Sequence, residues 1–383
     1  MMASDTSESL FPRPDTATDP ETDRTTGILP YQAIKDAIAN REIQAREEIG
    51  EAQIQPASLD LRLGPVAYRV RTSFLPGRNA TVQQKLDALA MHEVDLRTGA
   101  VLEKGCVYIV PLQEHLHLRK RISALANPKS STGRLDIFAR LITDYGTEFD
   151  RVRERYQGPL YAEISPRTFS VLVRENSRLV QLRIRRGSPP SSDAALRRLH
   201  DSVGLVNAEP GQEDIKNGLA ITVDLTSDGV AGYRAKKHAG LIDIDRIGHY
   251  DRADFWDPIR ADSDKGLILD PGEFYILASR ETVTVPVDHA AEMIAYDTLV
   301  GEFRVHYAGF FDPGFGLAET GGKGPRAVLE VRSHEVPFLI EDGQTVGRLV
   351  YEQLTATPEK LYGAVIGSSY QRQGLALSKH FKP

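Results

Sequence analysis

The sequence has few of the residues and motifs on which several common enzyme classes depend. Only one of its 383 residues is a cysteine, Cys106, which excludes an internal disulfide framework and any site that needs two thiolates. A lone cysteine in a strand-like segment is typical of a small buried side chain rather than of a nucleophile. Zinc-dependent nucleobase deaminases need a PCxxC pair, so the shortage of cysteine excludes that class.

Several nucleotide-binding, hydrolase and targeting signals are also missing. The chain contains no GxxxxGK[ST], GxGxxG or GxSxG motif. It has no run of eighteen apolar residues and no basic-then-apolar start, so we expect a cytoplasmic protein without a membrane segment. A formal net charge of -6 argues against a nucleic-acid coat protein but permits a local basic pocket for one nucleotide.

What is present indicates two mainly β domains. A chain of 383 residues exceeds the size at which single cores stop growing, roughly 250 to 300 residues. Residues 1–27 are rich in Asp, Thr, Ser, Glu and Pro, which predicts a flexible tail. A short amphipathic helix is expected within 28–43, and from Ser58 onward short β-type runs alternate with turn residues, as in sandwiches or barrels.

Segments of the first half recur in the second half at a nearly constant spacing. LEKGCVYIV at 102–110 resembles LDPGEFYIL at 269–277, an offset of 167 residues that also carries Glu163 onto Glu330. Because the spacing between matching residues stays the same over several segments, a duplicated domain explains the match better than two β meanders that became similar by convergence. The Pro/Ser stretch at 188–193 separates the copies, which predicts domains at 28–187 and 190–383.

The first copy contains a polar turn, NPKSSTGR at 127–134, that concentrates hydroxyl groups and cations. Such a turn suits an anion cradle, although a solvated turn has the same composition. The second copy cannot bind phosphate in this way, because the residues 167 positions on are of other types. Lys129, Ser130, Ser131 and Arg134 correspond to Tyr296, Asp297, Thr298 and Gly301.

Two acidic positions complete the candidate chemistry. Glu163 lies among apolar neighbours in a strand-like segment, where partial desolvation would raise its pKa toward the range useful for proton transfer. The alternative is an exposed strand residue that pairs with a cross-strand arginine such as Arg134. In the second copy, AGFFDPGFG at 308–316 places Asp312 in a tight turn that is either structural or set against a base.

Taken in order, these motifs resemble the long two-domain dCTP deaminases of the dUTPase superfamily, over about 28–187 and 190–376. That family has an SxDLRLG strand, a GRSSxxR turn, an IDPGW/Y hairpin and a VLEF-type strand with the catalytic Glu. The matches are SLDLRLG at 58–64, KSSTGR at 129–134, FDPGF at 311–315 with a loose counterpart at Phe149-Asp150, and YAEI at 161–164 with VLEV at 328–331.

The resemblance implies two tandem distorted jelly-roll β barrels with short helices, active as a homotrimer with sites between subunits. It implies that dCTP and water give dUTP and ammonia, which would supply dUTP for dTMP synthesis. Glu163 would activate the water that attacks C4 of cytosine, Ser130 would orient that water, and Arg134 would hold the Glu and the intermediate. No zinc is implied; Mg²⁺ would arrive on the triphosphate, and dTTP is a possible feedback inhibitor.

The resemblance also extends to the residues that would hold the substrate. The tail GSSYQRQGLALSKHF resembles a C-terminal segment that closes over the triphosphate, although a merely disordered terminus fits as well. The expected substrate-binding residues are Lys129, Ser131, Asp150, Asp312, Glu330, Tyr362, Tyr370, Arg372 and Gln373.

This sequence departs from the family pattern, because the first copy lacks the DPG hairpin and the second lacks the phosphate turn. If three chains form stacked rings, a ring of first copies would bring Ser130, Arg134 and Glu163 together. The alternative is a composite site that draws Asp312 or Glu330 from the second copy. Rival functions are a bifunctional deaminase and dUTPase, a dUTPase alone, and an inactive nucleotide-binding regulator.

Overall fold

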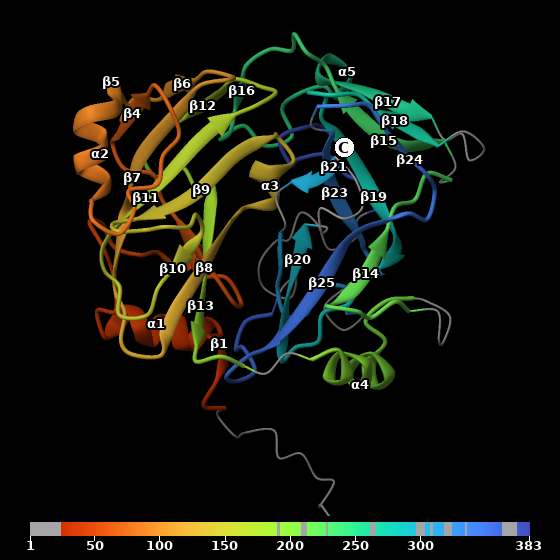
Figure 1. Cartoon of the computed structure of the whole chain (residues 1–383), viewed down its shortest axis with the longest axis horizontal. Helices are drawn as coiled ribbons and strands as arrows, with labels where there is room; N and C mark the ends of the chain where they lie inside the picture. Colours follow the sequence, from red (N-terminus) through yellow and green to blue (C-terminus); the bar gives the residue numbers. More distant parts are fainter. Residues whose placement is uncertain are drawn as a thin grey trace, which may run out of the picture.

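The chain is mainly β with a few short helices, as predicted (Figure 1). The longest described helix has 11 residues, so no helix among the described residues has the length and apolar character to cross a membrane. The structure is a computed structural model that describes residues 24–189, 192–207, 213–226, 229–260, 266–295, 303–306, 309–317, 324–333, 335–361 and 374–383.

The first half holds strands β1 to β13 with three short α-helices and one 3-10 turn. Their bounds are β1 Gly27–Ile28, α1 Tyr31–Ala39, β2 Ile43–Ala45, η1 Glu51–Gln53, β3 Leu59–Leu61, β4 Val66–Val70, α2 Val82–Leu89, β5 Ala90–Asp95, β6 Ala100–Leu102, β7 Val107–His117, β8 Ile122–Pro128, α3 Ser130–Gly133, β9 Ile137–Thr143, β10 Arg151–Val152, β11 Gln157–Pro166, β12 Val171–Val173 and β13 Val180–Arg186.

In the second half, the described residues form strands β14 to β25 and two helices. Their bounds are α4 Asp193–Val203, β14 Leu219–Thr222, β15 Val230–Ala235, β16 Ile242–Asp243, α5 Arg252–Phe255, β17 Trp256–Arg260, β18 Leu267–Leu269, β19 Tyr275–Thr282, β20 His289–Ala295, β21 Phe303–His306, β22 Phe310–Phe311, β23 Arg326–Ser333, β24 Phe338–Ile340 and β25 Thr345–Gln353.

The order of strand pairs is the same in both halves. In the first half β7 pairs with β4 and β11, and β8 pairs with β13; in the second half β19 pairs with β15 and β23, and β20 pairs with β25. The register repeats too, since Glu163 lies opposite Ile109 and Glu330 lies opposite Ile276. The 167-residue offset of the sequence therefore reappears in the strand pairing.

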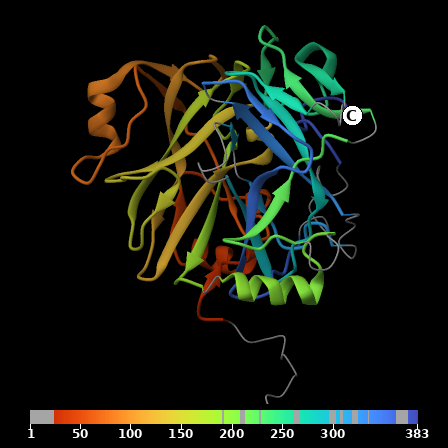
Figure 2. The ribbon, with the colours of Figure 1, turned by 45° about the vertical axis from the view of Figure 1, so that its right-hand side comes forward.

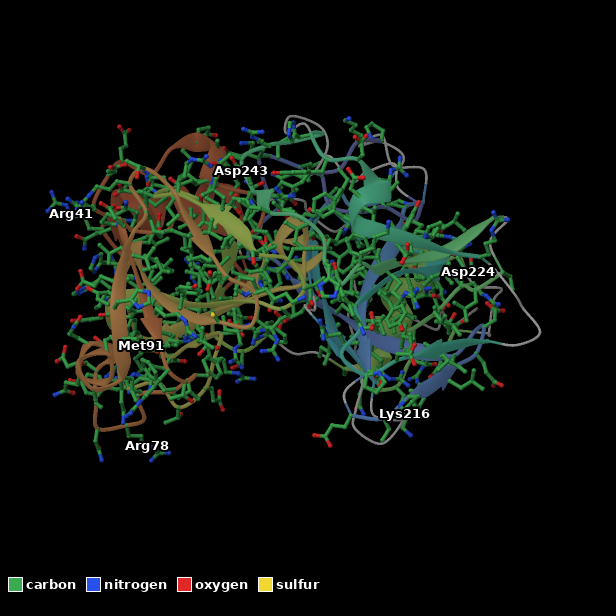
Figure 3. The ribbon with its side chains drawn as sticks, turned by 90° about the horizontal axis from the view of Figure 1, so that it is seen from above. Arg41, Arg78, Met91, Lys216, Asp224 and Asp243 are labelled. Carbon is green, nitrogen blue, oxygen red and sulfur yellow. The ribbon has the colours of Figure 1, made fainter. Side chains whose placement is uncertain are left out.

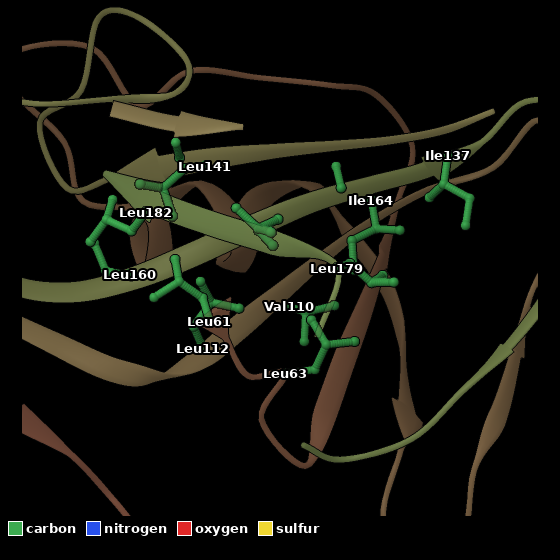
Figure 4. Close-up of a cluster of buried hydrophobic side chains, with 14 of the residues drawn as sticks. Leu61, Leu63, Val110, Leu112, Ile137, Leu141, Leu160, Ile164, Leu179 and Leu182 are labelled. Carbon is green, nitrogen blue, oxygen red and sulfur yellow. The ribbon is translucent and has the colours of Figure 1, made fainter. Parts of the chain in front are cut away.

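Burial follows from the side-chain pattern of each strand. In β8 every second residue is buried, which is the pattern of a strand with one face on a core. In β11 seven consecutive residues are buried, because one face points into the first-half core and the other lies under α2. The first core includes many leucine, isoleucine and valine side chains from facing strands, among them Leu61, Val110 and Leu182 (Figure 4).

The two halves lie side by side, with α2 and α4 at the periphery (Figures 1 and 2). Strand β16 of the second half adds in parallel to β12 of the first half. Arg174 of the first half donates to both carboxylate oxygens of Asp243 at 2.8 and 3.0 Å, at the junction seen in Figure 3. The core of the first half also includes Trp256 and Phe274 of the second half, so the junction is part of the core.

The described residues begin within the predicted tail, at residue 24, and residues 1–23 of that tail lie outside them. Gly27 lies in β1, and the backbone N–H of Arg24 donates to the carbonyl of Thr355 at 2.7 Å. A Cβ on Gly27 would lie 2.6 Å from the carbonyl oxygen of Gln353, so the glycine permits this close approach. The prediction was wrong at this end of the tail because contact with the distant strand β25 orders a segment of low apolar content.

Candidate active site

A cavity of about 520 Å³ lies between the two halves and is lined by both. The first half contributes the polar turn around α3, and the second half contributes the β22 hairpin and strand β23. The predicted site residues that line it are Lys129, Ser130, Ser131, Arg134, Asp312 and Glu330. Within one chain the polar turn of the first copy and the DPG turn and Glu330 of the second copy therefore line one cavity, as the composite alternative expects.

Cations gather at the side of the cavity that holds the polar turn. The Nζ of Lys129 forms an ion pair with the buried carboxylate of Asp60, and Arg178 lies 3.8 Å from the same carboxylate. Lys379 also lines the cavity; burial and the charge of Lys129 lower the pKa of its ammonium group. A polyanion bound here would relieve the repulsion between these cations.

Glu330 lies on β23 and is 6% exposed. Its Oε1 is 3.9 Å from the Nε of Arg134. Burial raises the pKa of the Glu330 carboxyl to about 8, and the nearby Arg134 charge offsets part of that rise. A carboxyl group with a pKa near neutrality can accept a proton in one step and return it in another.

Asp312 lies at the start of the turn that follows β22, the DPG turn, and is held by an arginine of the first half. The Nη2 of Arg183 is 3.5 Å from its Oδ1, and the guanidinium lies 3.9 Å from the ring centroid of Phe310. Burial raises the pKa of Asp312 to about 6 despite this cation. Gly316 allows the hairpin to close, because it has φ +79° and a Cβ there would lie 2.0 Å from the carbonyl oxygen of Val283.

Glu163 does not line this cavity. It accepts hydrogen bonds from Ser73 Oγ at 2.6 Å and Arg140 Nε at 3.2 Å, and it also pairs with Arg140 Nη2. Arg140 is its direct cross-strand neighbour on β9 and stacks on Phe149. Within one chain Glu163 therefore lies apart from Ser130 and Arg134, and its carboxylate is paired with a cross-strand arginine, Arg140 rather than Arg134. It is 1% exposed, so the alternative of an exposed strand residue is wrong about its exposure. A site formed by the first copies of neighbouring chains stays a prediction.

Asp150 also lies away from the cavity. Its carboxylate accepts from the backbone N–H of Leu141 at 2.7 Å, and burial raises its pKa to about 7. The expected substrate contact is thus not made within the chain, because the loosely matched Phe149-Asp150 segment supports the first-half sheet. Four further candidates lie outside the described residues: Tyr362, Tyr370, Arg372 and Gln373.

The last residues of the chain return to the cavity. Ser378 Oγ donates to the carbonyl of Ser131 at 2.9 Å, and Arg134 Nη1 donates to the carbonyl of Ala376 at 3.3 Å. His380 lines the cavity, and burial lowers its pKa to about 4, so it is neutral. Sequence reasoning missed the C-terminal Lys379 and His380, although both stand in the tail segment that carries the resemblance.

Comparison with known proteins identifies the family. Residues 25–188 match the model of the 2'-deoxycytidine 5'-triphosphate deaminase N-terminal domain, and residues 192–381 match that of its C-terminal domain. A "dCTP deaminase, dUMP-forming" of Kocuria rhizophila is 30% identical over 189 residues, which are 48% of this chain and 89% of that protein. The chain belongs to the dCTP deaminase family.

A solved dCTP deaminase has a closely similar structure. The crystal structure of 2'-deoxycytidine 5'-triphosphate deaminase from Agrobacterium tumefaciens is 55% identical, with a TM-score of 0.82 over 86% of this chain and 100% of that one. A "dCTP deaminase, dUMP-forming" of Beutenbergia cavernae is 34% identical over 119 residues, 30% of this chain and 58% of that protein. The match to this family member thus spans little more than half of its length.

Proposed function

We propose that this protein deaminates dCTP hydrolytically in the cavity between its halves, with Glu330 as the proton-transfer group. One observation carries the proposal: Glu330, with its pKa raised to about 8, lines the same cavity as Ser130 and Arg134. Family membership supports dCTP as the substrate. The assignment moves the catalytic role from Glu163 to its counterpart 167 residues on.

In the proposed reaction, ionised Glu330 takes a proton from a water molecule that attacks C4 of cytosine. The protonated carboxyl then gives that proton to the ring nitrogen N3. A second proton from the attacking water reaches the amino group through Glu330, and the C4–N bond breaks to release ammonia. Ser130 orients the water, and Arg134 stabilises the carboxylate and the negative charge on the intermediate. Proton transfer contributes about 10²- to 10⁴-fold, and electrostatic preorganisation supplies the rest.

The remaining cavity residues suit the rest of the nucleotide. Lys129, Ser131, Arg178 and Lys379 form the side that would bind the triphosphate with its Mg²⁺. The turn that contains Asp312 lines the same cavity and would contact the base and sugar. Closure by Tyr362, Tyr370, Arg372 and Gln373 stays a prediction.

The finer fold and assembly also belong to the proposal. We infer that each half is a distorted jelly-roll barrel of the dUTPase type, which the duplicated strand pairing supports. A trimer, inhibition by dTTP and a cytoplasmic location stay predictions from the family resemblance.

Two candidate functions differ in the nucleotide that they release. We propose dUTP, because the aspartates that line the cavity are each within 4 Å of a cation and so are poorly placed to activate water at phosphorus: Asp60 with Lys129 and Arg178, Asp245 with Arg174, and Asp312 with Arg183. The relatives named dUMP-forming favour a second candidate, in which deamination is followed by loss of pyrophosphate.

The proposal is tested by incubating the purified full chain with dCTP and Mg²⁺ and measuring ammonia, dUTP, dUMP and pyrophosphate. Ammonia with dUTP supports the first candidate, and ammonia with dUMP and pyrophosphate supports the second. Nucleotide binding without ammonia would indicate a regulator and overturn both.

A matched pair of variants tests the residue assignment. Glu330→Gln should lower kcat by roughly 10³-fold or more while dCTP still binds, because Gln cannot transfer a proton. Glu163→Gln, at the equivalent position of the other copy, should change kcat by less than about threefold. Equal loss in both variants would refute the assignment of Glu330.

A further inference from the structure

A second ion pair crosses the junction beside Arg134 and Glu330, with its charges reversed. Asp136 follows Arg134 by two residues, and Arg332 follows Glu330 by two residues on β23. Residues two apart on a strand point to the same face, so Glu330 and Arg332 both face the first half. Arg332 forms an ion pair with Asp136 there.

The Asp136–Arg332 pair is much the tighter of the two. Arg332 donates to Asp136 Oδ2 from Nε at 3.1 Å and from Nη2 at 2.6 Å. Thr168 Oγ1 donates to the same oxygen at 2.5 Å, and Arg332 Nη1 donates to the carbonyl of Gly272 at 2.9 Å. Asp136 is fully buried, so the pair is desolvated and held from both halves. The Arg134–Glu330 separation, by contrast, is 3.9 Å.

The backbone at Asp136 shows that the polar turn ends at this anchor. Its φ of 56° lies in the left-handed region, which is uncommon for a residue other than glycine. Its N–H donates to the carbonyl of Gly133 at 2.8 Å, and its carbonyl accepts from Arg167 at 2.9 Å. The anchored residue therefore closes the turn that carries Ser130 and Arg134.

The duplication does not provide this pair twice. The residue 167 positions after Asp136 is Phe303, and the residue 167 positions before Arg332 is Ser165. The Asp136–Arg332 pair is therefore particular to the junction that forms the cavity, rather than a general feature of the repeated domain.

We propose that Arg332 and Asp136 are positioning residues that set the distance and orientation of Glu330 relative to the polar turn. The inference rests on the proposed deamination. The tight pair fixes β23 against the turn, while the 3.9 Å gap beside it leaves Glu330 available to water and substrate. A shift of about 1 Å at a reacting group can lower a rate about 10²-fold.

The test compares full-length variants by ammonia release from dCTP. Arg332→Gln and Asp136→Asn should each lower kcat by about 10- to 100-fold and change KM by less than about threefold. Arg332→Lys should recover part of kcat, because lysine keeps the charge but not the paired donors. The double variant Asp136→Asn/Arg332→Gln should be no slower than the single variants, since both remove one interaction.

Arg185→Gln is the matched control. It breaks another ion pair between the halves, Arg185 with Glu352, and neither residue lines the cavity. It should lower the midpoint of thermal unfolding by less than Arg332→Gln does, because the Arg185–Glu352 pair is the more exposed of the two, and it should keep kcat within about threefold of the wild type. A comparable loss of kcat in Arg185→Gln would overturn the inference, because it would show that breaking any ion pair between the halves lowers kcat.

A pH profile separates positioning from simple loss of stability. Arg134 lowers the pKa of Glu330, so displacement of Glu330 from Arg134 raises that pKa. The acid limb of kcat/KM should therefore move to higher pH in Arg332→Gln and not in Arg185→Gln. If Arg332→Gln and Arg332→Lys fold and keep the wild-type kcat and acid limb, the positioning role of Arg332 is refuted while the proposed deamination stands. If the wild-type protein releases no ammonia from dCTP, the proposed deamination itself is refuted.

Discussion

At the scale of single residues, two equivalent glutamates differ through their partners. Glu163 and Glu330 occupy the same register of equivalent strands, and both are buried. Glu163 accepts from Ser73 and pairs with Arg140 inside its own half, whereas Glu330 faces the cavity with Arg134 at 3.9 Å. The first carboxylate is held by partners within its own half, whereas the second lines the cavity, where the proposed reaction would use it.

The raised pKa of Glu330 predicts the pH dependence of the reaction. The group must be ionised to accept a proton from water, and burial raises its pKa to about 8. The value of kcat/KM should therefore rise with pH, with a midpoint near 8 in the free protein, and fall tenfold for each pH unit well below it. Initial rates of ammonia release between pH 6 and 10 check this, and a midpoint at or below about 6 would contradict it.

At the scale of elements, strand β13 of the first half holds the hairpin of the second half. The Arg183 side chain is 2% exposed and donates to the carbonyls of Ala291 at 3.0 Å and Phe311 at 3.3 Å. It also lies beside Asp312 and over Phe310. Its sequence context, LRIRR, resembles an ordinary half-exposed strand, so its role appears only when the halves are docked.

Replacing Arg183 should destabilise the whole chain. Arg183→Met removes the charge opposite the buried Asp312 and should lower the free energy of unfolding by about 3 to 5 kcal/mol. Arg186→Met changes an exposed arginine of the same strand and should cost no more than about 0.5 kcal/mol. Urea unfolding of both variants measures the difference, and equal stability would show that Arg183 does not hold the hairpin.

At the scale of the whole molecule, the two halves form one unit. Trp256 and Phe274 pack in the first-half core, strand β16 extends a first-half sheet, and the cavity takes its lining from both sides. The described lining of the proposed site is divided between the halves, because the polar turn belongs to the first copy and the DPG turn to the second.

Separated halves should therefore be inactive and should recover activity together. Residues 24–189 or 192–383 expressed alone should release no ammonia from dCTP, because each lacks part of the site and exposes part of the shared core. Co-expressed halves should co-purify and regain activity. Turnover by residues 24–189 alone would instead support a site built from first copies, with Ser130, Arg134 and Glu163.

Local pattern was enough to predict much of this protein. Alternation of apolar residues, turn signals and the 167-residue offset predicted a mainly β chain with a repeated unit. The polar turn at 127–134 and the hairpin with Asp312 were found from residue types alone, and both line the cavity. These features depend on neighbours within a few residues, which a sequence records directly.

The choice of glutamate depended on the tertiary structure. Glu163 and Glu330 stand in similar local sequences, so periodicity and spacing give them the same environment. What separates them is which strand face meets the polar turn when the halves dock, and that is decided by contacts such as Arg332 with Asp136 and Arg183 with Asp312. Those contacts join residues 196 and 129 positions apart, beyond any local pattern.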